Sequence, residues 1–293
     1  MENEKSQWYD KSYKLLLAPP IIFLIICLVY LGSFYSSHGD FILKDASLSG
    51  GTTITLRGDF NAEELELGLK TVFEDVNVRT TSDLATGKHN SIIIDSSVQP
   101  DVLEAEIEKI IGAQLTEKDF STEFSGPALS KNFYRQLITA LLISFLLMSF
   151  VIFFLFRTFI PSIAVIFSAF ADIVMPLAIL DYFGVRISAA GIAGFLMLIG
   201  YSVDTDILLT TRVLKKREGT VNQRIFSSFK TGIFMTSTAL LAVLPAFLII
   251  TSLPDSFRQI FLILALGLFA DIINTWLTNA SVIKWYADKK GIN

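Results

Sequence analysis

The stretch LIGYSVDTDILL, residues 198–209, places two carboxyl groups, Asp204 and Asp206, inside a long apolar segment. A charged side chain at the centre of a bilayer costs about 3 kcal/mol on insertion scales, so acids in such segments face a protein interior or a water-filled path. The stretch therefore predicts a membrane helix that packs against other helices and shelters its acidic residues.

The whole chain has the composition of a membrane protein. Of its 293 residues, 52% are hydrophobic and 18% are charged, and the mean hydropathy is +0.55. The charged share is low against the usual quarter or so. Apolar residues concentrate in segments of about 20 residues, the length that crosses a bilayer as a helix. The sequence predicts an α-helical polytopic membrane protein with six transmembrane helices, at 15–34, 137–156, 159–183, 187–209, 231–252 and 259–283.

The first apolar segment has two interpretations, a cleavable signal peptide or a retained helix. A basic flank precedes it, as in signal peptides. Its apolar core is longer than a signal core, and Gly32-Ser-Phe-Tyr is a poor cleavage site, which favours a retained helix. Cys27 is the only cysteine, so the sequence predicts no disulfide and no Cys-based metal site.

Residues 35–133 form a polar, acidic insert after the first helix. Their pattern predicts strands at 46–57, 75–84, 91–96 and 119–125, and helices at 61–74 and 100–111. Asn61 is suited to cap the first of these helices, because Glu63 and Glu64 follow it in the first turn. The order β-α-β-β-α-β is the split pattern of ferredoxin-like α+β domains. We therefore expect an inserted ferredoxin-like domain.

The distribution of basic residues predicts the orientation in the membrane. Lys and Arg gather in the N-terminal segment, at Arg157, in the loop predicted at 212–230 and in the C-terminal tail, whereas Arg186 and Arg258 occupy the opposite turns. Basic loops remain on the cytoplasmic side. We expect a multi-pass plasma-membrane protein with cytoplasmic segments 1–14 and 286–293, an extracytoplasmic domain at 35–133, and the second to sixth helices within 134–285.

The candidate intramembrane acids are Asp172, Asp204, Asp206 and Asp271. No Arg lies in a helix core to pair with them, and unpaired intramembrane acids are what proton-driven transporters use as relays. The sequence therefore offers all four as proton-relay candidates. The alternative is that Asp271 and nearby Asn274 only form hydrogen bonds that hold helices together.

Asp204 and Asp206 differ in helical phase. They lie about 200° apart around a helix, so they cannot share a face. Asp204 lies on a stripe of small residues that includes Gly200 and permits close helix packing. We therefore expect Asp204 to be buried and to carry the proton chemistry, and Asp206 to line a polar path or to lie near the helix end.

Three motifs carry a resemblance to a known family. They are the pair Gly50-Gly51 before the first external strand, Ala171-Asp172-Ile173, and Gly200-Tyr201-Ser202-Val203-Asp204. Together with the topology they resemble the SecD/SecF family of protein-export membrane proteins, in particular its SecF branch of archaeal type. The resemblance covers nearly the whole chain. It implies a membrane half of the resistance-nodulation-division type that pairs with SecD, associates with a SecY-type channel and assists exported preproteins, with the proton gradient as the driving force in bacteria.

The chain departs from the bacterial SecF pattern at two places. Thr205 stands where the bacterial Gly-Tyr-Ser-x-Asn-Asp motif has its acid, and Asp204 matches the acid of SecD instead. Bacterial SecF also has an Arg in its fifth helix, for which the nearest aligned position here is Gly232. A relay through that Arg is therefore not predicted for this chain.

Other functions share some of these features. A transporter half that moves a small solute or ion would have similar helices, and a structural subunit of the export machinery would have the same resemblance. An intramembrane aspartyl protease could use Asp172 and Asp204 as a dyad, but the Gly-x-Gly-Asp and Pro-Ala-Leu elements of such enzymes are missing. We expect no enzymatic activity, no metal, no cofactor and no nucleic-acid partner.

Overall fold

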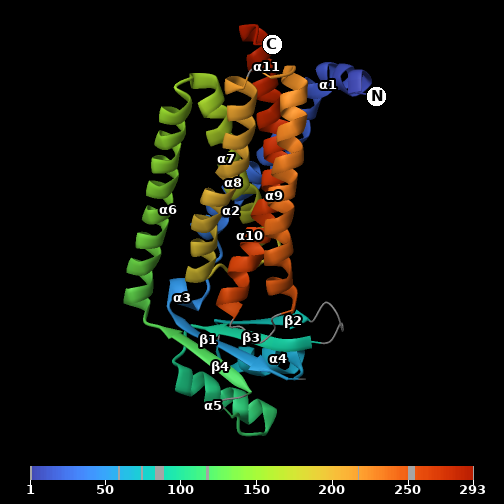
Figure 1. The fold of residues 1–293 in the computed structure, drawn as a ribbon. Helices are drawn as coiled ribbons and strands as arrows, with labels where there is room; N and C mark the ends of the chain where they lie inside the picture. The colour runs from blue at the N-terminus through green and yellow to red at the C-terminus, as the bar shows by residue number, and fades with distance from the viewer. Residues whose placement is uncertain are drawn as a thin grey trace.

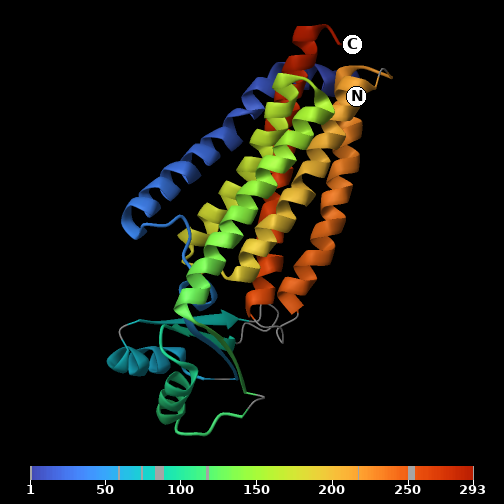
Figure 2. The ribbon, with the colours of Figure 1, turned by 90° about the vertical axis from the view of Figure 1, so that its left-hand side faces the viewer.

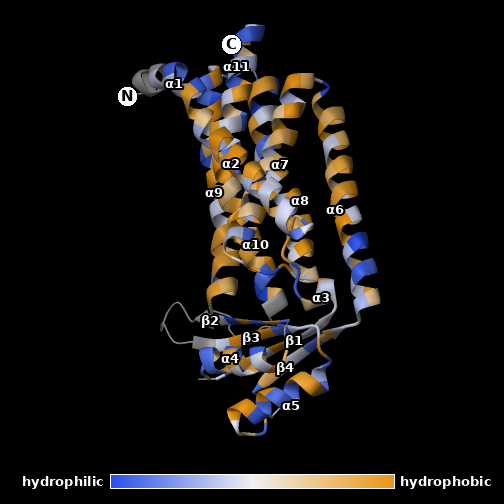
Figure 3. Cartoon of the chain, turned by 180° about the vertical axis from the view of Figure 1, so that it is seen from behind, coloured by the Kyte–Doolittle hydropathy of each residue, from blue (hydrophilic) through white to orange (hydrophobic). Residues whose placement is uncertain are grey.

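The computed structural model describes residues 2–58, 60–73, 75–82, 89–116, 119–216, 218–249 and 255–292. A bundle of long helices forms one end of the molecule, and a small sheet with its own helices forms the other (Figure 1). Within the described ranges, six helices are long and apolar enough to cross a membrane. Hydrophobic residues cover much of their length (Figure 3). The protein is therefore a polytopic helical membrane protein, as predicted.

The membrane helices follow the predicted order. They are α2 (Ala18–His38), α6 (Pro127–Phe156), α7 (Phe159–Tyr182), α8 (Ala189–Lys215), α9 (Val221–Ile249) and α10 (Asp255–Ile273). The last span continues through the π-helical segment η1 (Asn274–Asn279) into α11 (Ala280–Lys290). A helix that was not predicted, α1 (Glu2–Leu16), precedes α2, and α2 runs at a slant to the other helices (Figure 2).

The segment 212–230, predicted as a loop, is largely helical, which corrects the sequence analysis. α8 continues to Lys215 and α9 begins at Val221, so both helices extend beyond their apolar residues. Arg212 links these two ends, since its Nη1 donates to Ser227 O at 3.1 Å and to Thr231 Oγ1 at 2.9 Å. Polar side chains in this segment thus form hydrogen bonds between the two helix ends, and only a short connection separates α8 from α9.

The sheet unit has the predicted element order. It consists of β1 (Gly51–Arg57), α4 (Ala62–Val72), β2 (Val76–Ser82), β3 (His89–Ser96), α5 (Pro100–Ile111) and β4 (Phe120–Ser125). The strands form an antiparallel sheet in the order β2-β3-β1-β4, and α4 and α5 cover the face away from the bundle (Figure 1). The predicted ends at residues 74 and 84 lie outside the described residues.

The core of this unit lies between the sheet and its two helices. Ile54, Ile94, Leu69 and Leu103 are 0% exposed, and burial of a side chain of this size contributes about 1.5–3 kcal/mol. Asn61 caps α4, because its side chain accepts from the amides of Glu63 and Glu64 as predicted. The unit thus has a small hydrophobic core of its own.

The strand predicted at 46–57 begins as a helical turn instead, which is a second correction. Residues Ala46–Ser49 form α3, and Asp45 caps it by accepting from the amides of Ser47 and Leu48. Such side-chain capping competes with extended structure. Leu48 is 2% exposed and packs into the helix bundle, so the apolar residue that suggested a strand serves another core.

Gly50 and Gly51 separate α3 from β1 and have φ values of 89° and 131°. A Cβ at Gly50 would lie 2.5 Å from Pro127 Cα, and a Cβ at Gly51 would lie 2.3 Å from Ser96 O. Only glycine accommodates both the positive φ and the close approach. The pair therefore serves the junction between the sheet unit and the start of α6.

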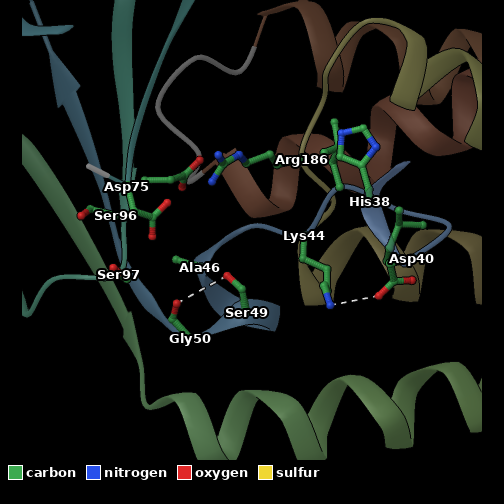
Figure 4. Close-up of a pocket in the computed structure, with 14 residues that line it drawn as sticks. His38, Asp40, Lys44, Ala46, Ser49, Gly50, Asp75, Ser96, Ser97 and Arg186 are labelled. Atoms are coloured by element: carbon green, nitrogen blue, oxygen red, sulfur yellow. Dashed lines mark hydrogen bonds and ion pairs between the residues drawn. The ribbon is translucent and has the colours of Figure 1, made fainter. Parts of the chain in front are cut away.

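A second contact joins the segment before β1 to the turn between α7 and α8. Ile187 N donates to Leu43 O at 2.6 Å, Asp45 N donates to Ile187 O at 3.1 Å, and Ala189 N donates to Ser47 Oγ at 3.0 Å. A pocket of about 340 Å³ lies beside this contact, where Lys44 Nζ pairs with Asp40 Oδ2 at 2.9 Å and Arg186 reaches toward the sheet (Figure 4). The α7–α8 turn is thus hydrogen-bonded to the segment that leads into β1.

Candidate functional site

Three carboxyl groups meet in the interior of the helix bundle. Asp172 on α7, Asp206 on α8 and Asp271 on α10 are each 0% exposed. The three helices pack against one another, and each carries its acid on the inward face. The burial predicted for Asp172 and Asp271 is confirmed.

Asp172 is held by two neutral donors. The hydroxyl of Ser202 on α8 donates to Asp172 Oδ2, and Asn274 Nδ2 donates to Asp172 Oδ1 at 2.6 Å. Ser202 and Asn274, predicted as supporting polar residues, therefore belong to the cluster. Asn274 connects α7 with the last span, so the alternative that it helps to hold helices together also agrees with this contact.

Asp271 is surrounded by hydroxyl groups from three helical segments. Its Oδ1 lies 2.8 Å from Thr205 Oγ1 on α8 and 2.9 Å from Thr275 Oγ1 on η1, and its Oδ2 lies 3.5 Å from Thr236 Oγ1 on α9. Thr205 thus brings a hydroxyl group to the place where the bacterial motif has an acid.

Asp206 is a full member of the cluster. Its Oδ1 accepts from Asn279 Nδ2 at 2.7 Å and lies 2.9 Å from Thr275 Oγ1. No hydrogen bond among the described residues reaches its Oδ2, which is also buried. The expectation that Asp206 lies near a helix end or only lines a polar path is therefore wrong.

Every hydrogen-bond donor to the three acids is neutral. Within the described part of the chain, no ion pair includes Asp172, Asp206 or Asp271. An isolated buried carboxylate is costly, and three in one cluster repel each other as well. The arrangement is suited to binding and releasing protons, because a bound proton removes the charge of a carboxylate that has no cationic partner among the described residues.

Asp204 lies outside the cluster, contrary to the sequence analysis. It is exposed, as are Gly200, Tyr201 and Met197 on the same side of α8. The predicted phase difference between Asp204 and Asp206 is correct, but the small-residue stripe faces away from the bundle. Asp172 and Asp204 therefore do not form the dyad that an aspartyl protease would require.

The position aligned with the bacterial Arg is closed by an aromatic side chain. A Cβ at Gly232 would lie 2.3 Å from Trp276 Cζ2 and 2.9 Å from Trp276 Cη2. Trp276 is 7% exposed and comes from the same η1 segment that supplies Asn274 and Thr275. Any side chain at position 232 would therefore require the Trp276 ring to move.

Four members of the site were not predicted as site residues: Thr205, Thr236, Thr275 and Asn279. A sequence signal exists for Thr275 and Asn279, because they and Asp271 recur every four residues in the last apolar span, which places polar groups along one face. The π-helical turn that aligns them has no comparable signal. Such turns are rare and often mark functional sites.

Comparisons with known proteins agree with this architecture. The profile described as "Protein export membrane protein SecD/SecF, C-terminal" matches residues 106–289. The SecF proteins of Methanolacinia petrolearia and Pyrococcus furiosus are 36% and 35% identical to the chain; they cover 95% and 94% of it, and the matches span 95% and 92% of their own lengths.

A solved structure shows the same fold. SecDF from Thermus thermophilus superposes with a TM-score of 0.76 at 17% sequence identity, over 95% of this chain and 38% of the SecDF chain. The chain thus spans well under half of that larger protein. Given the profile match and the SecF relatives, the chain belongs to the SecF branch of the SecD/SecF family of protein-export membrane proteins.

Proposed function

We propose that this SecF protein couples the proton gradient to protein export through Asp172, Asp206 and Asp271. The observation that carries the proposal is their complete burial among neutral donors, with no ion pair to any of the three in the described residues. A proton that enters the cluster changes its charge, and the helices that hold the acids respond to that change. Each elementary charge moved across 100 mV is worth about 2.3 kcal/mol, which shifts a two-state equilibrium about fiftyfold.

The exposed side of α8 supports SecD as the partner. Met197 and Tyr201 are 47% and 51% exposed there, and Asp204 lies beside them. A carboxyl group facing lipid is costly, so a second protein covers this side. The structural relative is named SecDF, and this chain spans only 38% of the SecDF chain. Its name supports SecD as the protein that covers this side. In this arrangement Asp204 acts at the interface with SecD.

We propose that the sheet unit acts on polypeptide outside the cell. The positive-inside rule puts both termini in the cytoplasm and residues 35–133 on the extracytoplasmic side of the plasma membrane, where preproteins leave a SecY-type channel. The strand order β2-β3-β1-β4 and the two covering helices support the ferredoxin-like assignment. The hydrogen bonds from Ile187 and Ala189 to residues 43–47 provide a route from the acid-bearing helices to this unit.

The test is gradient-driven export in sealed membrane vesicles that contain this chain, SecD and the SecY-type channel. Asp206→Asn replaces the carboxyl group with an amide of similar shape that cannot bind and release a proton. We expect this variant to abolish stimulation of export by the proton gradient and to assemble with SecD as the wild type does. Asp288→Asn is the control, because Asp288 lies in α11, where it pairs with Lys284 at 2.7 Å, and it contacts none of the three acids in the described residues.

Full gradient stimulation in Asp206→Asn would rule out proton coupling through this cluster and favour a structural role. Loss of stimulation in Asp288→Asn as well would show that the assay responds to Asp→Asn changes outside the cluster. Asp204→Asn tests the exposed side of α8 independently of the buried cluster. We expect this variant to weaken association with SecD more than it alters proton binding by the cluster.

A further inference from the structure

The hydroxyl group of Thr275 lies midway between two carboxyl groups. Thr275 Oγ1 is 2.9 Å from Asp206 Oδ1 and 2.9 Å from Asp271 Oδ1. These acids come from different helices, α8 and α10, and Thr275 itself is 0% exposed. The three oxygen atoms form a continuous row with hydrogen-bond spacing at both steps.

The single proton of the Thr275 hydroxyl group cannot form both hydrogen bonds in this row. A hydroxyl group donates one hydrogen bond and otherwise accepts. If Thr275 donates to one carboxylate, its contact with the other is a hydrogen bond only when that other carboxyl group carries a proton. Two ionised acids would leave a pair of oxygen atoms at 2.9 Å with no proton between them.

The neighbouring donors do not remove this requirement. Thr205 Oγ1 lies 2.8 Å from Asp271 Oδ1 but also 3.0 Å from Ser202 O, and it has a single proton to donate. Asn279 Nδ2 donates to the same Asp206 oxygen that Thr275 contacts. Neither group can supply a proton to both contacts of Thr275, so a carboxyl proton completes the row.

We propose that Thr275 transfers protons between Asp206 and Asp271. This inference rests on the proposed proton coupling. In the transfer, the O–H bond of protonated Asp271 breaks as its proton moves to Thr275 Oγ1, and the O–H bond of Thr275 breaks as its proton moves to Asp206 Oδ1. Thr275 ends as a neutral hydroxyl group, Asp271 becomes a carboxylate and Asp206 becomes a neutral acid. The reverse transfer follows the same path.

The π-helical segment explains how Thr275 reaches both acids. A regular α-helix turns by about 100° per residue, so residues four apart drift around the axis. The wider turn of η1 offsets this drift, so that Thr275 and Asn279 both reach Asp206, while Asp271 lies just before η1 at the end of α10. Asn279 then fixes the Asp206 oxygen that receives the proton, through its 2.7 Å hydrogen bond.

The test compares Thr275→Val with Thr275→Ser in the vesicle assay with SecD present. Valine keeps the volume and removes the hydroxyl group, whereas serine restores it. We expect gradient stimulation of export to fall at least about tenfold in Thr275→Val and to recover in Thr275→Ser, because one positioned proton-transfer group typically contributes roughly 10²–10⁴ in rate. Thr275→Ala is a second hydroxyl-free variant that adds no volume, for use if valine prevents assembly.

Thr278→Val is the matched control. Thr278 lies in the same segment and is 4% exposed, and its hydroxyl group forms no hydrogen bond to the described residues. We expect this variant to behave like the wild type. A structural role for the Thr275 methyl group would instead leave Thr275→Val active and impair Thr275→Ser.

Infrared spectra of the same complexes in lipid give a readout that does not depend on export. The carbonyl stretch of a protonated Asp, assigned by its loss in Asp271→Asn or Asp206→Asn, should shift in Thr275→Val and return in Thr275→Ser. Normal stimulation and an unshifted band in Thr275→Val, with Asp206→Asn inactive, would overturn the role of Thr275 and leave proton coupling intact. Full stimulation in Asp206→Asn would overturn the coupling itself.

Discussion

The indole ring of Trp276 fills the space beside Gly232, so that a Cβ at Gly232 would lie 2.3 Å from Trp276 Cζ2. The ring belongs to η1 and the glycine to α9, and their contact sets how closely these two elements approach. It also separates this chain from the bacterial pattern, in which a basic residue stands in the fifth helix.

Gly232→Ala should therefore destabilise the bundle. Alanine normally stabilises a helix by about 1 kcal/mol relative to glycine, but overpacking against a ring costs about 1–3 kcal/mol. We expect a lower free energy of unfolding by denaturant in detergent. Gly32→Ala is the control, because a Cβ at Gly32 on α2 meets nothing within 4 Å. Equal stability of the two variants would contradict the contact, and Trp276→Phe should partly rescue Gly232→Ala.

Ser47→Ala should weaken the contact between the segment before β1 and the α7–α8 turn. Ser47 Oγ accepts from Ala189 N at 3.0 Å and donates to Asp45 Oδ1 at 2.6 Å. A buried amide without an acceptor costs about 1–3 kcal/mol. We expect a loss of stability of that size and faster hydrogen exchange at the Ala189 amide.

The control for this change is Ser37→Ala, since the Ser37 hydroxyl forms an exposed hydrogen bond to Ser33 O within α2. It should leave both readouts unchanged. Protection of the Ala189 amide that survives in Ser47→Ala would show that another acceptor replaces the hydroxyl group.

The stability of the sheet junction should depend on pH through Asp45. Burial raises the pKa of Asp45 from 3.8 to about 7. The hydrogen bonds from Ser47 lower this pKa, whereas the nearby charge of Asp95 raises it further. Between these values the folded protein retains a proton that the unfolded chain has released. The free energy of unfolding therefore falls as the pH rises from about 4 to about 7, by at most about 1.4 kcal/mol per pH unit from this group.

Asp45→Asn should remove this component of the slope while it preserves the cap of α3, because Asn is as good an N-cap as Asp. Thermal unfolding of wild type and variant across this pH range measures the difference. Ser37→Ala, which changes no titratable group, should retain the wild-type slope. Parallel pH curves for wild type and Asp45→Asn would refute the assignment.

Gly200→Trp tests the side of α8 that we assign to SecD. A Cβ at Gly200 meets nothing within 4 Å in this chain, so the substitution should leave its own fold intact. It should reduce recovery of SecD in copurification at least about tenfold, equivalent to about 1.4 kcal/mol of lost contact energy. Val29→Trp is a control on α2, at a residue that is 68% exposed. Equal recovery of SecD with both variants would place the interface elsewhere.

The sequence predicts the architecture well because membrane spans and strand patterns leave strong local signals. Six apolar spans, the Asn61 cap and the order of the external elements all follow from periodicity and capping. The error at 46–57 arose because Leu48 is apolar for contact with the bundle and not with the sheet. The fifth span began ten residues too late because hydropathy does not detect polar helix ends such as that containing Ser227.

The site was harder to predict because it depends on which face of a helix turns inward. Helical phase correctly separates Asp204 from Asp206, but Gly200, whose small size suggested burial of Asp204, lies on a side of α8 that is exposed in the described part of the chain. Asp206 is inside because Thr275 and Asn279 come toward it from η1. Long-range packing of this kind leaves no trace within the twelve residues 198–209.

The close approach of Gly50 to Pro127 has a mechanical consequence. The chain passes into the sheet unit at Gly50-Gly51 and returns to the bundle at Ser125–Pro127, and Gly51 pairs with Ser125 across β1 and β4. Both passages of the backbone thus lie at one point. The sheet unit can therefore rotate relative to the helix bundle without stretching either connection. A side chain at Gly50 would collide with Pro127 and obstruct this rotation.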